Sequence, residues 1–295
     1  MTVFKSGFIA ISGAPNAGKS TLLNRLLGQK ISITSRKPQT TRNRILGVMH
    51  KPTSQIVFID TPGIHNTRNP LNLKMVETAI SAFGDVDLIL VLVDASRPDP
   101  ESEKLIVHHL NRQSRKVILA LNKIDRLKKP ALLDIIDKWS GTHPYEAIIP
   151  VSAKHGTQVP ELVSTMEACL EEGPPFFPED TLTDMPERFI ASEIIREKVF
   201  RLTGQEIPYS TAVTIDGFSE EKNGLVTISA VIHVERDSQK GIVIGKKGIK
   251  LKDIGEQSRK DLEIMLGAGV FLKLFVRVQK NWSRDTKAIR KFGYS

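Results

Sequence analysis

The stretch Gly13-Ala-Pro-Asn-Ala-Gly-Lys-Ser20 constrains the fold of this chain more than any other. It matches the pattern G-x-x-x-x-G-K-[ST] and lies between a short apolar run, residues 8–12, and a helix-forming segment, residues 21–27. A glycine-rich loop in that setting wraps its backbone N–H groups around phosphate oxygens at a helix N-terminus. The pattern therefore predicts a strand, a phosphate-binding loop and a helix, and it leaves ATP and GTP both open.

The first 170 or so residues alternate short apolar runs with longer mixed segments. The runs are four to six residues long and rich in β-branched side chains, and they occupy residues 8–12, 55–59, 88–93, 117–121 and 147–151. Such runs are typical of strands buried on both faces of a mainly parallel sheet, with helices in the mixed segments between them. We expect an α/β fold for this part of the chain.

A change of pattern follows Glu172-Gly-Pro-Pro-Phe-Phe-Pro178, where two prolines after a glycine end the preceding helix. Beyond it the periodicity indicates helix, strand, strand, helix, loop, helix and strand, which is a separate α+β domain. We predict a nucleotide-binding domain over residues 1–173, a linker over 174–187, a second domain over 188–280 and a basic tail over 281–295.

The motif Asn122-Lys-Ile-Asp125 selects the base. It follows an apolar run, and its carboxylate at Asp125 can accept hydrogen bonds from the ring N–H and the exocyclic amine of guanine, which adenine does not offer. Ser152-Ala-Lys154 follows the next run, where a backbone N–H can meet the guanine oxygen. The two motifs together predict GTP rather than ATP.

Asp60-Thr-Pro-Gly63 follows another run, and we expect Asp60 to hold Mg²⁺ and the Gly63 N–H to meet the γ-phosphate. A threonine hydroxyl for Mg²⁺ comes from Gln39-Thr-Thr-Arg-Asn43, with Thr41 preferred over Thr40. The residue after Gly63 is Ile64, at the position where Ras-like enzymes have a glutamine that orients the attacking water. We therefore expect slow intrinsic hydrolysis of GTP. His65 is the nearby alternative base, although a single loop histidine is more often incidental.

Charge and cysteine content limit the kinds of partner and the cellular compartment that fit this chain. Residues 1–235 hold 27 Lys and Arg against 27 Asp and Glu, whereas residues 236–295 hold 15 against 6. This concentration of positive charge is typical of a surface that binds a polyanion, although a merely solvated basic face has the same composition. The single cysteine, Cys169, excludes an internal disulfide and makes a cysteine-based zinc site improbable. We expect a cytoplasmic protein without a signal peptide or membrane span.

The order of these motifs resembles the Era family of bacterial GTPases. The resemblance rests on P-N-x-G-K-S, Q-T-T-R, D-T-P-G with an apolar follower, N-K-x-D and S-A-K, and it continues through F-P-E-D, A-S-E-I-I-R-E-K and V-I-G-K-K-G in the second half. It implies a GTPase joined to a type II KH domain that binds small-subunit (16S) ribosomal RNA near its 3′ end, not DNA. It also implies assistance to 30S subunit assembly, some peripheral membrane association, and K⁺-assisted hydrolysis from the asparagine at Asn16.

The residues support the RNA-binding half independently of the resemblance. Gly245-Lys-Lys-Gly248 lies between two expected helices, where glycines let an RNA backbone approach closely and lysines meet its phosphates. Four isoleucines around this loop can serve either the core or the bases: Ile242, Ile244, Ile249 and Ile254. In the tail, Trp282 and Phe292 can either stack on bases or anchor the tail to its own domain.

The predicted site residues fall into five groups. Phosphate-binding residues are Gly13, Asn16, Ala17, Gly18, Lys19, Ser20, Thr21 and Gly63. Magnesium-binding residues are Ser20, Thr41 and Asp60. Switch residues are Gln39, Thr40, Thr41, Asp60, Thr61, Pro62, Gly63 and Ile64. Guanine-binding residues are Asn122, Lys123, Asp125, Ser152, Ala153 and Lys154. RNA-binding residues are Gly245, Lys246, Lys247, Gly248 and Lys250.

Two other function classes fit parts of the sequence. A tRNA-modifying GTPase has the same form of phosphate loop, but it requires a C-terminal cysteine and a cofactor domain that this sequence does not show. A membrane-associated regulatory GTPase would use the basic C-terminal region on anionic lipid. The sequence contains no long basic amphipathic helix with bulky apolar residues, so we keep this class as the alternative.

Overall fold

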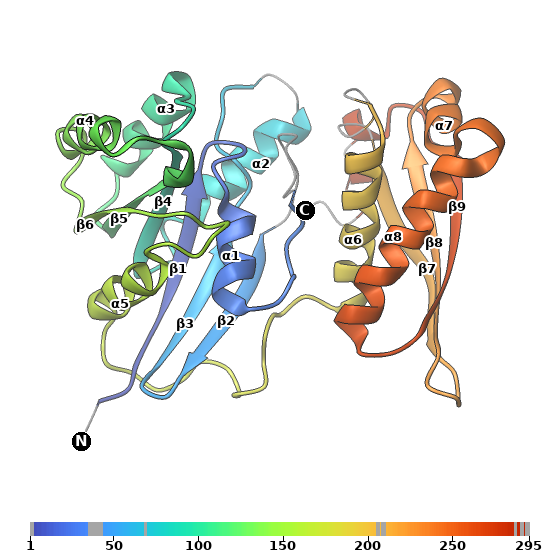
Figure 1. Ribbon diagram of the computed structural model, residues 1–295, viewed down its shortest axis with the longest axis horizontal. Helices are drawn as coiled ribbons and strands as arrows, with labels where there is room; N and C mark the ends of the chain where they lie inside the picture. The colour runs from blue at the N-terminus through green and yellow to red at the C-terminus, as the bar shows by residue number, and fades with distance from the viewer. Residues whose placement is uncertain are drawn as a thin grey trace. The chain divides into compact units, whose positions relative to one another are not determined.

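The computed structural model describes residues 3–34, 44–67, 70–204, 207, 211–285, 288, 289 and 292. The chain divides into two compact units, Met1–Ser32 with Thr41–Asp184 and Ile33–Thr40 with Met185–Ser295 (Figure 1). Gln39, Thr40 and Thr41, which we predicted as switch and magnesium-binding residues, lie outside the described residues.

The first unit is built around a six-stranded sheet in the order β2-β3-β1-β4-β5-β6. All neighbouring strands are parallel except β2, which is antiparallel to β3. The strands are β1 (Lys5–Gly13), β2 (Ile45–Lys51), β3 (Ser54–Asp60), β4 (Leu88–Asp94), β5 (Lys116–Asn122) and β6 (Ala147–Pro150). The helices are α1 (Lys19–Leu27), α2 (Pro70–Ser81), α3 (Pro100–Leu110), α4 (Lys129–Ser140) and α5 (Val159–Cys169), with the short helix η1 (Ile124–Arg126) after β5.

The five apolar runs form β1, β3, β4, β5 and β6, as expected. Alternate residues of a strand point to opposite faces of the sheet, and in β4 and β5 both sets are buried. One set, with Ile89 and Val91 in β4, packs with residues of α2, α3 and α4 in a single core cluster. Burial on both faces explains why these strands are continuous apolar runs and not alternating ones.

Local capping fixes where α3 begins. The Asp99 side chain accepts a hydrogen bond from the Ser102 backbone N–H at 3.2 Å, while the Asp99 N–H donates to the Glu103 carboxylate at 3.0 Å. Pro100 occupies the first helical turn, where its missing N–H has no cost. These reciprocal bonds satisfy backbone groups that a helix end otherwise leaves unpaired.

Strand β2 was not among the predicted strands. It is an edge strand that pairs with β3 through a tight connection, and the chain after the two prolines runs along it. The Val48 N–H donates to the Leu182 carbonyl at 2.8 Å, and the Gln55 side chain of β3 bonds the backbone of Phe176 and Phe177. The segment predicted as a linker thus covers an exposed sheet edge, and the first compact unit extends to Asp184.

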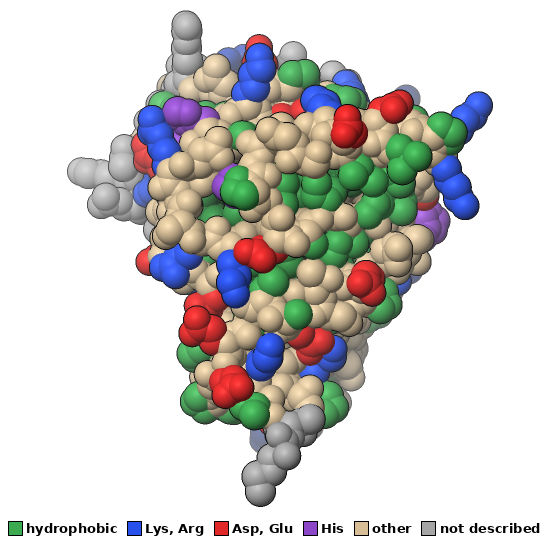
Figure 2. Space-filling model, turned by 90° about the vertical axis from the view of Figure 1, so that its left-hand side faces the viewer, with side chains coloured by type: hydrophobic (Ala, Val, Ile, Leu, Met, Phe, Trp, Pro, Cys, Tyr) green, Lys and Arg blue, Asp and Glu red, His purple; other side chains and the backbone are tan. Residues whose placement is uncertain are grey.

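At the opposite edge of the sheet, β6 has no further strand beside it among the described residues. Figure 2 looks onto that side of the molecule, where hydrophobic side chains gather in one area between scattered charged ones. Leu133 of α4, 68% exposed, is one of the large apolar side chains on the surface of this unit.

The second unit has the element order expected from its sequence. It consists of α6 (Glu187–Leu202), β7 (Ala212–Glu220), β8 (Val226–Val234), α7 (Asp237–Ile244), η3 (Lys246–Gly248), α8 (Ile249–Leu266), β9 (Val270–Val278) and η4 (Trp282–Arg284). The sheet order is β7-β8-β9, with β7 antiparallel and β9 parallel to β8. Strand β7 contains a bulge between Ile215 and Gly217, beyond which its pairing with β8 continues to Glu220.

The core of the second unit lies on one face of its sheet. Ile228, Ala230 and Ile232 of β8 pack with buried residues of α6, α7 and α8. In the tail, Trp282 is fully buried, and its ring meets that of Phe292 edge to face at 5.1 Å. The sequence left two roles open for these rings, stacking on bases or anchoring the tail to its own domain, and the structure supports the second.

Candidate nucleotide site and nucleic-acid interface

The phosphate loop joins the end of β1 to the start of α1. Gly13 and Gly18 have φ values of 151° and 107°, and a Cβ on either would collide, with the Leu92 carbonyl oxygen and the Asn122 side chain respectively. Gly18 also carries no side chain that could cap α1, so the first N–H groups of the helix are suited to an anion. Asn16, exposed at the tip of the loop, adopts a left-handed φ of 64°.

Lys19 is buried within this loop. Its Nζ donates to the carbonyl oxygens of Gly13 and Ala14, both at 3.0 Å. Burial lowers the Lys19 pKa to about 8, although the nearby Asp60 carboxylate opposes the shift. The ammonium group is therefore held by loop carbonyls at the position from which it can reach phosphate oxygens.

Nucleotide binding should therefore take up protons near pH 8. Phosphate oxygens favour the charged form of Lys19, so binding raises a pKa that burial depresses. The free protein keeps this proton below pH 8 and loses it above, whereas the complex retains it. The affinity for nucleotide is therefore highest below pH 8 and falls as the pH rises through 8, by about fourfold between pH 7 and 8.5.

Calorimetry of GDP binding at pH 8, in two buffers of different ionisation enthalpy, measures this uptake. Lys19→Arg is the matched variant, because its guanidinium stays charged and should bind nucleotide without taking up the proton. Equal heats in the two buffers for the unmodified protein would contradict the role assigned to Lys19.

Oxygen ligands suited to Mg²⁺ meet beside the loop. The Asp60 carboxylate is fully buried, and its Oδ2 accepts from the Ser20 hydroxyl at 3.0 Å and from the Ser32 hydroxyl at 2.9 Å. Asn24 holds the backbone of Ser32 from both sides, accepting from its N–H and donating to its carbonyl. Hydroxyl and carboxylate oxygens are the donors that Mg²⁺ prefers, so Ser20 and Asp60 fit the ion.

Ser32 and Asn24 were missed by the sequence reasoning. Neither belongs to a motif with fixed spacing, and only the Asn24 hydrogen bonds bring Ser32 to the carboxylate.

The segment after β3 lies against the phosphate loop. The Thr61 hydroxyl donates to the Ile11 carbonyl at 2.9 Å, and the Ile64 N–H donates to the Gly13 carbonyl at 3.1 Å. The Ile64 side chain is fully buried in the core cluster that includes α2 and α3, so it cannot orient a water molecule. His65 bonds locally instead, with Nδ1 2.9 Å from the Gly63 carbonyl oxygen.

Asn122 ties the two base-binding motifs to the phosphate loop. Its side-chain amide donates to the Ala17 carbonyl at 2.7 Å, and its Oδ1 accepts from the Ala153 N–H at 2.9 Å. Lys123 has a left-handed φ of 67°, and its Nζ donates to the Asn16 carbonyl at 2.7 Å and pairs with Asp94 at 2.5 Å. The structure thus brings motifs more than 100 residues apart into one site.

Asp125 is prepared to accept hydrogen bonds from a base. The Ser152 hydroxyl donates to its Oδ1 at 2.6 Å, and this bond is the main reason that the Asp125 pKa lies below its usual range. The lowered pKa means that these surroundings favour the ionised carboxylate, which suits contact with the N–H groups of guanine.

Arg25 of α1 supports the other guanine-side loop. Its Nε donates to the Ala153 carbonyl at 3.2 Å, and its Nη2 donates to the Lys154 carbonyl. Like Asp94, Arg25 was not predicted, because its position in the last turn of α1 belongs to no motif and its partners are distant in sequence.

In the second unit, Gly245-Lys-Lys-Gly248 joins α7 to α8 as expected. Both glycines and Lys247 have positive φ values of 72°, 78° and 52°, and Lys246 and Lys247 are exposed, while Lys250 is half-buried in the first turn of α8. This backbone turns sharply and displays its cations outward, as contact with phosphates requires.

The four isoleucines around the loop divide between two roles. Ile254 is fully buried in the core, whereas Ile242 and Ile249 are 45% and 59% exposed, and Ile244 is half-buried. From Gly248 a groove runs between α8 and β9, with Leu251 and Gly255 on one wall and Leu272 on the other. Exposed isoleucines beside an apolar groove suit unstacked bases.

These geometries define two classes of module. The first unit has the sheet, phosphate loop and guanine-side loops of a P-loop GTPase, and the second has the element order and glycine loop of a KH domain. Two family models match accordingly, "50S ribosome-binding GTPase" over residues 8–123 and "KH domain" over residues 206–283.

Curated relatives match the whole chain. GTPase Era of Geobacter metallireducens is 54% identical over 293 residues, which cover 99% of this chain and 98% of the relative. GTPase Era of Geobacter sp. (strain M21) is 56% identical over 292 residues, with the same shares covered. This chain belongs to the Era family of GTPases.

Solved structures of the family agree with this fold. A crystal structure of Era in complex with MgGDPNP and nucleotides 1506–1542 of 16S ribosomal RNA has a TM-score of 0.95 and 42% identity, and 99% of each chain is covered. An Aquifex aeolicus Era variant bound to GDP·AlF₄⁻ also gives a TM-score of 0.95 at 42% identity, with 99% of this chain and 100% of that chain covered.

No helix among the described residues is both long and apolar enough to cross a membrane. No group of three or more His, Cys, Asp or Glu in that part of the chain could hold a metal ion.

Proposed function

We propose that this GTPase binds small-subunit ribosomal RNA near its 3′ end and assists maturation of the 30S subunit. The observation that carries the proposal is the presence, in one chain, of a complete guanine pocket and a glycine loop that displays two exposed lysines beside an apolar groove. The solved relative that matches 99% of this chain was crystallised with a nucleotide analogue and 16S RNA nucleotides 1506–1542, which supports both halves.

The nucleotide site would hold GTP or GDP with Mg²⁺ through Ser20 and Asp60, with Thr41 as a third ligand. The bound ion supplies positive charge next to the transferring phosphoryl group, and Lys19 supplies more from the loop side. The buried Ile64 leaves the attacking water to a partner, the backbone or a monovalent cation, so intrinsic turnover should be slow. K⁺ beside Asn16 is the cation that we propose, since Asn16 is exposed on the phosphate loop.

On the RNA side, the backbone would lie against Gly245 and Gly248, with Lys246, Lys247 and Lys250 near its phosphates. Only a glycine fits at position 245, because its φ is 72° and a Cβ there would lie 2.7 Å from the Lys250 Cβ. Bases in the groove would be recognised at their edges, and the 2′-hydroxyl would favour RNA over DNA.

We place this function in the cytoplasm, with peripheral membrane association as a minor component. The basic surface near the C-terminus would attract anionic headgroups as well as RNA. A primarily membrane-bound regulator is the alternative, and a pull-down with anionic vesicles in parallel with RNA separates the two.

Binding of RNA from the 3′ end of the small-subunit molecule tests the proposal. Lys246→Ala combined with Lys247→Ala should weaken this RNA by about 10- to 100-fold, because two phosphate contacts are lost, and should leave GDP affinity unchanged. A matched control removes two exposed lysines of α4, Lys129→Ala with Lys138→Ala. Binding that survives the first double variant, or that falls equally in the control variant, would count against the clamp.

A further inference from the structure

The outward face of β9 carries an unusual set of side chains. Phe271, Lys273, Phe275 and Arg277 alternate with residues that pack towards the helices, and all four are exposed. Phe271 is 49% and Phe275 57% exposed, so two large rings stand in solvent on one strand. Two large exposed aromatic rings on one strand are typical of a binding surface.

The register of the sheet puts these side chains on the face opposite the core. Phe271 pairs with Thr227 and Phe275 with Val231, both on the side of β8 that faces away from α6, α7 and α8. Thr227 and the neighbouring Ser229 are small, so the rings project beyond the side chains of β8 on this face. We call the surface formed by Phe271, Lys273, Phe275 and Arg277 the β9 shelf.

The described part of the tail covers one end of this face and leaves the shelf open. His233, which pairs with Arg277, is buried, and its ring lies 4.5 Å from that of Phe292. Among the described residues no strand pairs with the outer edge of β9, so the shelf borders solvent along that edge.

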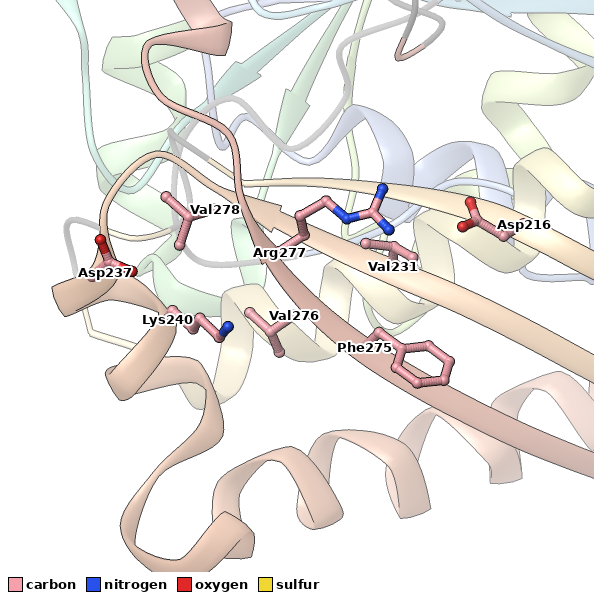
Figure 3. A pocket seen from close by; sticks show the side chains of 8 residues that line it. All are labelled: Asp216, Val231, Asp237, Lys240, Phe275, Val276, Arg277 and Val278. Carbon is pink, nitrogen blue, oxygen red and sulfur yellow. The ribbon is translucent and has the colours of Figure 1, made fainter.

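Charge on the shelf is mainly positive. The Lys273 Nζ lies 5.3 Å from the centre of the Phe271 ring, and the Arg277 side chain extends across the sheet towards Asp216 (Figure 3). None of the four shelf residues is acidic, and the two carboxylates that line the hollow beside Arg277 are those of Asp216, which accepts a hydrogen bond from Thr214, and Asp237. Rings that alternate with cations are the arrangement used for single-stranded nucleic acid, where bases stack and phosphates meet positive charge.

The shelf is continuous with the groove that starts at the glycine loop. Phe271 lines the groove together with Gly248 and Leu251. Phe275 and Arg277 border a second hollow, which Lys240 and Asp237 of α7 line from the other side (Figure 3). A strand of RNA in the groove can therefore cross the free edge of β9 and reach the shelf.

We propose that the β9 shelf is a second RNA contact, on which two unpaired bases flanking the groove-bound segment stack on Phe271 and Phe275 while Lys273 and Arg277 meet their phosphates. The inference rests on the proposed RNA-binding function. The two rings are four residue steps, or about 13 Å, apart along the strand, and bases stacked on each other lie only about 3.4 Å apart, so each ring takes its own base.

The test uses fluorescein-labelled single-stranded RNA of five and of twelve nucleotides from the 3′ end of small-subunit ribosomal RNA. Phe275→Leu keeps the apolar surface but removes the shelf ring that lies outside the groove. We expect this variant to bind the 12-mer about tenfold more weakly and the 5-mer within about twofold of the unmodified protein. In a separate variant, Phe275→Trp should retain 12-mer affinity, and its indole fluorescence should fall when a base stacks on it.

Ile264→Ala is the matched control, because Ile264 is an 82% exposed apolar residue of the same unit, on α8. Unchanged melting temperature and GDP affinity establish that the leucine variant is folded. Three outcomes would contradict RNA binding by the β9 shelf. The leucine variant could bind the 12-mer as tightly as the unmodified protein does, or it could lose affinity equally for the 12-mer and the 5-mer. It could also lose binding to phosphatidylglycerol vesicles while its RNA affinity stays unchanged. Failure of the unmodified protein to bind either RNA would instead overturn the proposed function.

Discussion

Asp125→Asn should shift the preferred base from guanine to xanthine. We expect GDP affinity to fall by about 10²- to 10³-fold, because two hydrogen bonds to a charged acceptor are lost and an amide N–H then faces the N–H groups of guanine. Xanthosine diphosphate presents a carbonyl in place of the exocyclic amine, so its affinity should rise by a similar factor. Competition between the two nucleotides for the purified protein measures both changes.

The structure explains why the effect should be large. Ser152 donates to the Asp125 Oδ1, and the main chain of Ala153 is held by Asn122 and Arg25, so the pocket cannot easily rearrange around a different side chain. Asp134→Asn makes the same chemical change at an exposed position on α4 and should leave both affinities unchanged. Unaltered GDP affinity in Asp125→Asn would remove the basis for assigning guanine to this site.

Gly63→Ala should slow GTP hydrolysis by about 10²-fold while GDP affinity stays within about threefold. A Cβ at Gly63 would lie 2.8 Å from the Pro15 backbone nitrogen and 2.9 Å from its Cα. Because backbone atoms of the phosphate loop cannot yield as a flexible side chain can, the segment after β3 must move away from the γ-phosphate. Loss of one backbone donor to a transferring group has about this effect.

Single-turnover hydrolysis and GDP titration measure the two quantities separately. The control is Gly141→Ala at the end of α4, where an added Cβ meets no atom within 4 Å and φ is −83°. Hydrolysis at the unmodified rate in Gly63→Ala would mean that this segment does not contact the γ-phosphate during the reaction. A parallel fall in GDP affinity would mean that the substitution damages the phosphate loop itself.

The sequence was sufficient to predict those parts of the sites that require a particular local backbone conformation. The phosphate loop, the guanine-side motifs and the loop at Gly245 and Gly248 each require glycine or polar side chains at fixed spacing. The element order of the second unit was also predictable, and α8 lies between Gly248 and Gly267 because both glycines adopt a left-handed φ that breaks the helical pattern. Doubly buried strands were recognisable because both of their faces are apolar.

Tertiary structure alone decided which residues complete each site. Ser32 reaches Asp60, and Arg25 reaches the loop of Ala153, through contacts between residues far apart in the chain. No spacing rule encodes such contacts, because they depend on how strands and helices pack.

Burial also distinguishes residues of the same type that have different roles. Ile254 and Ile249 are the same residue type on one helix, yet the first is in the core and the second faces solvent. Trp282 was equally suited to stacking on RNA, and it is instead fully buried against its own domain. The rings of Phe271 and Phe275 show the converse case, since the pattern of β9 shows alternation but only the sheet register shows which face the helices cover. The chemistry of the loops can be predicted from the sequence, because it depends on neighbouring residues. The surfaces that remain exposed to partners cannot, because exposure depends on the whole fold.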